Sequence, residues 1–118
     1  MYYPKKLFIK KDLDIAHFKN LGRYIKSMQY ESGAIPSDDD GFHDPWDHME
    51  SIMGLSFSNE YIASKLAFSW LIKNQNSDGS WFAKYKNEVP VEKNKPTHFG
   101  PYISVAALHF YKIFLDKD

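Results

Sequence analysis

The segments Gln29-Tyr-Glu-Ser-Gly33 and Gln75-Asn-Ser-Asp-Gly79 each follow a run of residues with helical periodicity. The glutamines at positions 29 and 75 are 46 residues apart, and so are the glycines at positions 33 and 79. The second segment continues into Ser80-Trp81. An internal period of this length is typical of stacked helical repeats. The chain is therefore predicted to contain one helix–loop–helix unit twice.

Four stretches of the chain show apolar residues at every third or fourth position, which predicts amphipathic helices. Asp44 is a suitable N-cap for the second helix, and Pro45 suits its first turn. The predicted helices cover about 12–30, 45–57, 59–75 and 97–116. The remainder reads as an extended lead-in over 1–11 and as loops over 34–45 and 76–97, which contain several prolines, aspartates and glycines.

The order of these elements predicts an all-α fold built from two antiparallel helical hairpins. Residues 1–118 would form a single domain, with repeat one at about 12–57 and repeat two at about 58–116. The two glutamine–glycine segments lie at the same point of each repeat, where the first helix passes into its loop. Long loops at one end of a helical array are where binding residues usually gather.

Composition excludes several classes of protein. The 118 residues carry 15 basic and 15 acidic side chains, so no basic face for nucleic acid is expected. The absence of cysteine excludes disulfides and thiolate metal sites and fits a reducing compartment, which predicts a cytoplasmic protein. No apolar run reaches membrane-spanning length, and the first residues lack the pattern of a signal peptide.

The strongest candidates for chemistry surround the start of the second helix. Asp44 and Asp47 are three residues apart, and Asp44 and His48 are four apart, which can place carboxylate and imidazole on one face. Such a group suits proton transfer, so Asp44, Asp47 and His48 are the predicted catalytic residues. The alternative is structural, with Asp44 as the cap, Asp47 near the positive helix end and His48 paired to one of them. No cofactor is firmly implied; a divalent metal is possible, with no ligand set assigned.

Further aromatic and polar residues near the loops are predicted to contact substrate. They are His43, Trp46, Glu50, Trp81, His98 and Tyr102. A structural role is predicted for the repeated segments, with Gln29 and Gln75 satisfying backbone groups and Gly33 and Gly79 allowing a positive φ. Trp81 would place its ring on the neighbouring repeat.

Several motifs are similar to those of known families. Gln75-Asn-Ser-Asp-Gly79-Ser-Trp81 resembles the QW motif of squalene and oxidosqualene cyclases, and Gln29 to Gly33 with Ile35 resembles a degenerate copy. The segment Gly41-Phe-His-Asp-Pro-Trp-Asp-His-Met-Glu50 looks like bacterial proteins described as prenyltransferase-like. This resemblance implies an α/α toroid, of which the chain would be the N-terminal portion. Asp38-Asp39-Asp40 does not match the acidic motif of the cyclases, and the zinc-binding cysteine of protein prenyltransferases has no counterpart.

Three functions are consistent with these observations, and whether the chain is an enzyme remains open among them. The first is a prenyltransferase- or terpenoid-cyclase-like protein acting on an isoprenoid or another apolar substrate. The second is a non-catalytic module that self-associates or docks on a partner supplying further helical hairpins. The third is an α/α-barrel-like glycoside-processing protein, with Trp46 and Trp81 as stacking platforms and Asp44 and Asp47 as the acids.

Overall fold

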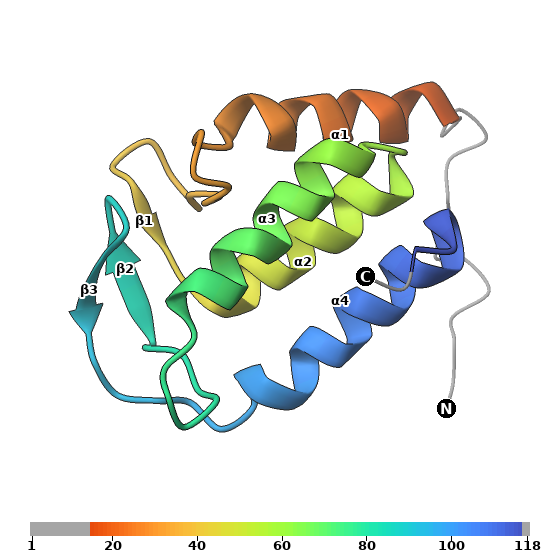
Figure 1. The fold of residues 1–118 in the computed structure, drawn as a ribbon. Helices are drawn as coiled ribbons and strands as arrows, with labels where there is room; N and C mark the ends of the chain where they lie inside the picture. The colour runs from red at the N-terminus through yellow and green to blue at the C-terminus, as the bar shows by residue number, and fades with distance from the viewer. Residues whose placement is uncertain (1–14, 117–118) are drawn as a thin grey trace, which may run out of the picture.

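The structure, a computed structural model, describes residues 15–116. Within this range the elements are α1 (Ile15–Met28), β1 (Phe42–His43), α2 (Pro45–Phe57), α3 (Tyr61–Asn74), β2 (Lys84–Lys86), β3 (Val89–Glu92) and α4 (Phe99–Phe114) (Figure 1). Helix α2 is central, because it packs against α1, α3 and α4. The predicted lead-in over 1–11 and the first residues of the predicted first helix lie outside the described range.

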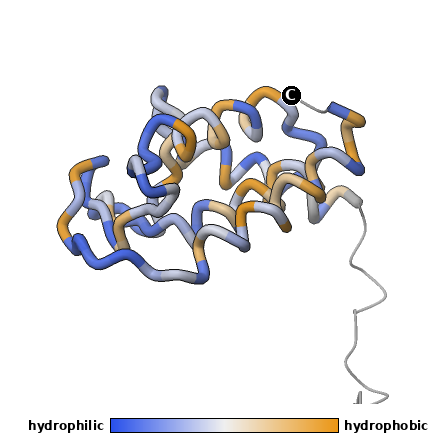
Figure 2. The backbone as a smooth tube through the Cα atoms, turned by 60° about the horizontal axis from the view of Figure 1, so that its bottom comes forward, coloured by the Kyte–Doolittle hydropathy of each residue, from blue (hydrophilic) through white to orange (hydrophobic). Residues whose placement is uncertain are grey.

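All four predicted helices are confirmed, with ends that differ by only a few residues from the expected ones. Asp44 caps α2 in an extended conformation (φ −126°), accepting a hydrogen bond from the Asp47 N–H, and Pro45 occupies the first turn. Helices α1 and α3 run in one direction and α2 and α4 in the other (Figure 1). Hydrophobic residues recur among hydrophilic ones along the helical coils (Figure 2), as the predicted periodicity requires.

The prediction of an all-α fold is wrong, because the two loops form a three-stranded antiparallel sheet in the order β1-β2-β3. Strand β1 lies in the first loop and pairs with β2 of the second, placing Phe42 opposite Lys86 and His43 opposite Tyr85. Asn87 and Glu88, both with positive φ, form the tight turn from β2 to β3. Strands of two to four residues are too short to show alternation, so the local pattern did not reveal them.

One hydrophobic core joins the two repeats. Its largest fully buried side chains include Trp70, Trp81, Tyr85, Met49 and Leu71, which come from α2, α3 and the second loop. Burial of each such side chain contributes about 1.5–3 kcal/mol relative to exposure. The loops are therefore part of the packed interior. The sheet lies at the end of the molecule where α2 begins, which is where the predicted catalytic residues are (Figure 1).

The two glutamine–glycine turns have the same geometry. Gln29 Nε2 donates to the Gly33 carbonyl (3.2 Å), and Gln75 Nε2 donates to the Gly79 carbonyl (2.9 Å). Both glycines have positive φ, +97° and +84°. The backbone bonds also correspond: Tyr30 N–H to the Ala34 carbonyl and Asn76 N–H to the Ser80 carbonyl, each 2.8 Å. The 46-residue period is thus a repeat of structure as well as of sequence.

Candidate functional site

Four of the predicted substrate-binding residues meet where α2 and α4 begin. Trp46 and Tyr102 stack with ring centroids 3.7 Å apart and planes 6° apart, and His98 contacts Trp46 edge-on at 5.0 Å. Glu50 Oε1 accepts hydrogen bonds from Trp46 Nε1 (3.0 Å) and from the Tyr102 hydroxyl (3.1 Å). We call Trp46, Glu50, His98 and Tyr102 the aromatic–carboxylate cluster.

The cluster follows from helical spacing. Trp46 and Glu50 are four residues apart on α2, and His98 and Tyr102 are four apart at the start of α4, so each pair shares a helix face. Because α2 and α4 run in the same direction, their N-terminal ends bring the two faces together (Figure 1). Partial burial and the adjacent Glu50 carboxylate raise the pKa of Tyr102, which keeps its hydroxyl a hydrogen-bond donor.

His48, a predicted catalytic residue, lies in the core. Its Nδ1 accepts from the Ile35 N–H (3.3 Å), and its Nε2 faces the Ala67 carbonyl at 2.9 Å, so the proton sits on Nε2 of a neutral ring. Burial, with a smaller effect of His43, lowers the pKa of His48 to about 4. The imidazole joins the first loop to α3 and has no free nitrogen with which to exchange a proton with a substrate.

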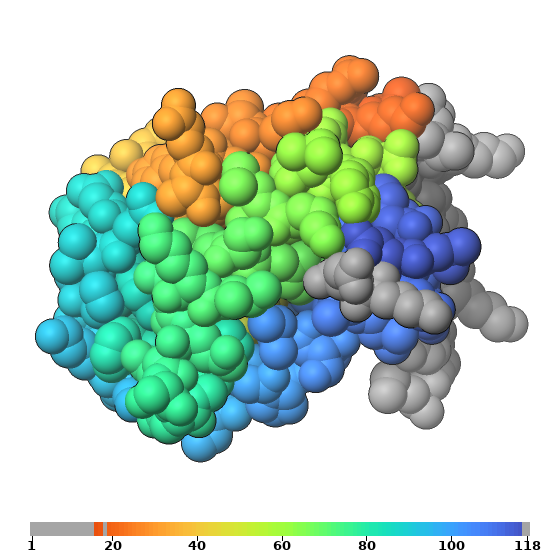
Figure 3. Space-filling view, in the orientation of Figure 1, coloured from red at the N-terminus to blue at the C-terminus, as the bar shows by residue number. Residues whose placement is uncertain are grey.

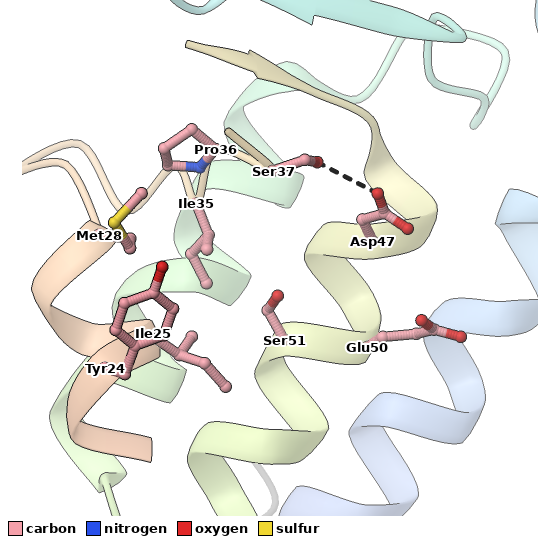
Figure 4. Close-up of a pocket in the computed structure, with 9 residues that line it drawn as sticks. All are labelled: Tyr24, Ile25, Met28, Ile35, Pro36, Ser37, Asp47, Glu50 and Ser51. Atoms are coloured by element: carbon pink, nitrogen blue, oxygen red, sulfur yellow. Dashed lines mark hydrogen bonds between the residues drawn. The ribbon is translucent and has the colours of Figure 1, made fainter. Parts of the chain in front are cut away.

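The carboxylates of Asp44 and Asp47 bond groups other than the His48 ring. Burial raises the pKa of Asp44, whose carboxylate is engaged as the cap, with Oδ1 accepting from the Asp47 N–H at 2.9 Å. Asp47 is exposed and accepts from the Ser37 hydroxyl at 3.1 Å (Figure 4). Asp47 and Ser37 border a pocket of about 410 Å³ between α1, the first loop and α2. Glu50 also lines it, although its side chain points toward α4 (Figure 4).

The cap itself is testable. Replacing Asp44 with alanine leaves the Asp47 N–H without its acceptor and should lower the free energy of unfolding by about 1 kcal/mol. Asp44→Asn retains a cap acceptor and should recover most of that loss. Urea unfolding followed by circular dichroism measures both, and equal losses in the two variants would contradict the assignment.

His43 and Trp81 also lie in the core. His43 is 1% exposed, stacks on Tyr85 (5.4 Å) and meets Trp70 edge-on (4.9 Å). Neither of its ring nitrogens has a hydrogen-bond partner within the described residues. Trp81 Nε1 donates to the Leu71 carbonyl on α3 at 2.8 Å. Both rings therefore support the scaffold, and neither presents a surface to a ligand.

Among the pocket residues that the sequence did not indicate are two serines. Ser37 reaches Asp47 from the first loop, and no sequence signal places it there. Ser51 lies one helical turn after Asp47 on α2, a spacing that could have indicated it. In residues 15–116 no group of three or more histidine, aspartate or glutamate side chains could hold a metal ion. No helix in the same range is long and apolar enough to cross a bilayer.

Comparison with known proteins reveals a similarity over most of the chain. No protein-family model matches the chain, so the resemblance to cyclases and prenyltransferase-like proteins stays a prediction. The chain is 33% identical, over 93 residues, to MMP endo-(1,4)-3-O-methyl-alpha-D-mannosidase of Mycolicibacterium hassiacum. That match covers 79% of this chain and 26% of the mannosidase, so the chain spans about a quarter of the length of the curated relative it matches.

Proposed function

We propose that the chain provides a carbohydrate-binding surface of a glycoside-processing protein, and that the aromatic–carboxylate cluster is that surface. The observation that carries the proposal is the Trp46–Tyr102 stack held by the Glu50 carboxylate. A sugar ring has apolar C–H faces that pack on aromatic rings and hydroxyl groups that donate to carboxylates. The cluster combines both kinds of contact at the partly exposed start of two helices.

The name of the mannosidase relative suggests the ligand class. It describes cleavage within (1,4)-linked 3-O-methyl-α-mannose chains, and we carry this ligand class to our chain as part of the proposal. An O-methyl group adds apolar surface to a sugar, which suits a site rich in aromatic rings. The relative's name agrees with the glycoside-processing alternative among the predicted functions and gives no support to the isoprenoid alternative.

We assign binding rather than bond cleavage to these residues. Glycoside hydrolysis commonly needs two carboxyl groups on opposite sides of the scissile bond, one of them protonated. Burial raises the pKa of Asp44, as a general acid requires, but its Oδ1 is already occupied by the helix cap. Glu50 is likewise engaged with Trp46 and Tyr102 and is placed to orient hydroxyl groups. We therefore do not assign to this surface the pair of free carboxyl groups that hydrolysis needs.

Trp46→Ala should weaken oligosaccharide binding about tenfold or more, because one aromatic stacking surface contributes roughly 1–2 kcal/mol. Calorimetric titration with an α-(1,4)-linked 3-O-methylmannose tetrasaccharide measures the loss. The matched control is Phe57→Ala, which removes an exposed aromatic ring at the opposite end of α2. Equal affinity of the two variants, or tighter binding of farnesyl diphosphate than of the tetrasaccharide, would overturn the proposal.

A further inference from the structure

Helix α3 of repeat two packs against repeat one (α1, the first loop and α2) through small residues of its own. Ala63, Ser64 and Ala67 of α3 are buried, and α3 packs against α2. Four side-chain contacts hold α3 there: Gln29 Nε2 to the Ala63 carbonyl (3.0 Å), His48 Nε2 to the Ala67 carbonyl (2.9 Å), Ser56 to Ser64 (3.3 Å) and Lys26 to Glu60 (2.9 Å). In addition, a Cβ at Gly33 would collide with the Leu66 carbonyl.

Repeat two (α3, the second loop and α4) has an open groove between its two helices. The groove between α3 and α4 has a volume of about 790 Å³ and is lined mainly by apolar side chains, among them Phe68, Ile72, Ile103 and Leu108. Helices α3 and α4 (green and blue) both reach the face shown in Figure 3. Helix α3 itself packs against α2 of repeat one.

Equivalent residues of α2 and α4 differ sharply in exposure. When the first-turn prolines Pro45 and Pro101 are aligned, positions in α4 lie 56 residues after those in α2. The three core residues of α2 then correspond to apolar residues of α4 that remain exposed. Met49, Ile52 and Leu55 are 0% exposed, whereas Val105, Leu108 and Tyr111 are 41%, 52% and 38% exposed.

The turns of repeat two also leave space for a further helix. Gly79 repeats the geometry of Gly33 but is exposed, and the nearest atom to a Cβ there lies 3.9 Å away. Leu115 adopts φ 54° after α4, as Asn59 adopts φ 65° after α2. Asp116 then pairs with Lys65 of α3 (3.2 Å), as Glu60 pairs with Lys26 of α1. A residue with positive φ thus follows both α2 and α4, and Asp116 lines the open groove.

We propose that the groove between α3 and α4, with the Gln75–Gly79 turn, seats a third helical hairpin that lies outside these 118 residues. The first helix of that hairpin carries small residues at the positions of Ala63, Ser64 and Ala67. A second copy of this chain does not supply it, because His17 and Leu21 stand 46 residues before Ala63 and Ala67. Both are exposed and too large to approach the groove as the alanines do.

An extended chain tests this inference. Residues 61–116 are added a second time after Asp116, so that Leu115-Asp116 replaces Asn59-Glu60 as the entry to the added helix. We expect one cooperative thermal transition at a higher midpoint than that of the original chain. Gly79→Ala should lower the midpoint by about 5 °C in the original chain, from backbone strain alone, and by about 10 °C in the extended chain, where the turn becomes buried. Gly100→Ala is the control, since a Cβ there meets no atom within 4 Å.

Two results would overturn the inference. The first is failure of the added hairpin to dock. It would appear as an equal effect of Gly79→Ala in the original and extended chains, or as aggregation of the extended chain while the original stays monodisperse. The second is a stable dimer of the original chain, seen by analytical ultracentrifugation, that Leu108→Asp dissociates, because a second copy would then occupy the groove. Protection of residues 103–111 from hydrogen exchange in the extended chain alone would support it. The outcome is independent of the oligosaccharide titration.

Discussion

The free energy of unfolding should fall by roughly 3 kcal/mol as the pH is lowered from 6.5 to 4, with most of the loss attributable to His48. Burial lowers the pKa of this imidazole from 6.5 to about 4 in the folded protein. One pKa unit corresponds to about 1.4 kcal/mol, which sets the size of the effect. For a protein of this size such a loss is a large part of the total stability.

The direction follows from proton binding in the two states. Below pH 6.5 the unfolded chain binds a proton at His48, whereas the folded chain does so only near pH 4. The unfolded state therefore binds more protons between these values, and stability rises with pH across that window. Burial also lowers the pKa of His43, which contributes in the same direction. The stability conferred by both neutral rings is fully present above pH 6.5.

Urea unfolding at a series of pH values measures the slope. His48→Gln keeps a hydrogen-bonding side chain but cannot titrate, and it should flatten the dependence between pH 6.5 and 4. His109→Gln, which replaces an exposed histidine, is the control variant. An unchanged slope in His48→Gln would show that this imidazole is not the group responsible.

Gly33→Ala should destabilise the protein by about 3 kcal/mol or more. The residue has φ +97°, which costs a non-glycine residue roughly 1–2 kcal/mol. A Cβ would also collide with the carbonyl oxygen and carbon of Leu66, which are backbone atoms of α3 and cannot rotate away. The clash can be removed only if α3 moves away from the Gly33 turn. That movement would break the hydrogen bond from Gln29 to the Ala63 carbonyl.

Gly79→Ala is the matched control for this prediction. It has nearly the same φ, +84°, within the same hydrogen-bonded turn, but its Cβ would meet no atom closer than 3.9 Å. The difference in free energy of unfolding between the two variants isolates the packing of α3 from the backbone strain. Calorimetry of both variants should show a midpoint about 10 °C lower for Gly33→Ala. Equal midpoints would mean that α3 does not press on the Gly33 turn.

Local sequence signals located the helices and two turns well. Pro45 and the cap Asp44 marked the start of α2, and the spacing of Gln29 and Gln75 marked two turns with the same hydrogen bonds. These features depend on residues close together in the chain, so composition and spacing are sufficient. The i,i+4 pairs Trp46–Glu50 and His98–Tyr102 were likewise recognisable one pair at a time.

Only the tertiary structure decided which of the candidates meet. His43, His48 and Asp44 follow one another closely in sequence, yet two are buried in the core and one caps a helix. The sheet formed because strands from loops more than 40 residues apart paired, and that pairing depends on how the repeats dock. The sequence by itself determined the helices and the period, because their causes are local. Packing at a distance, which depends on burial and shape, separated the core histidines from the partly exposed aromatic–carboxylate cluster.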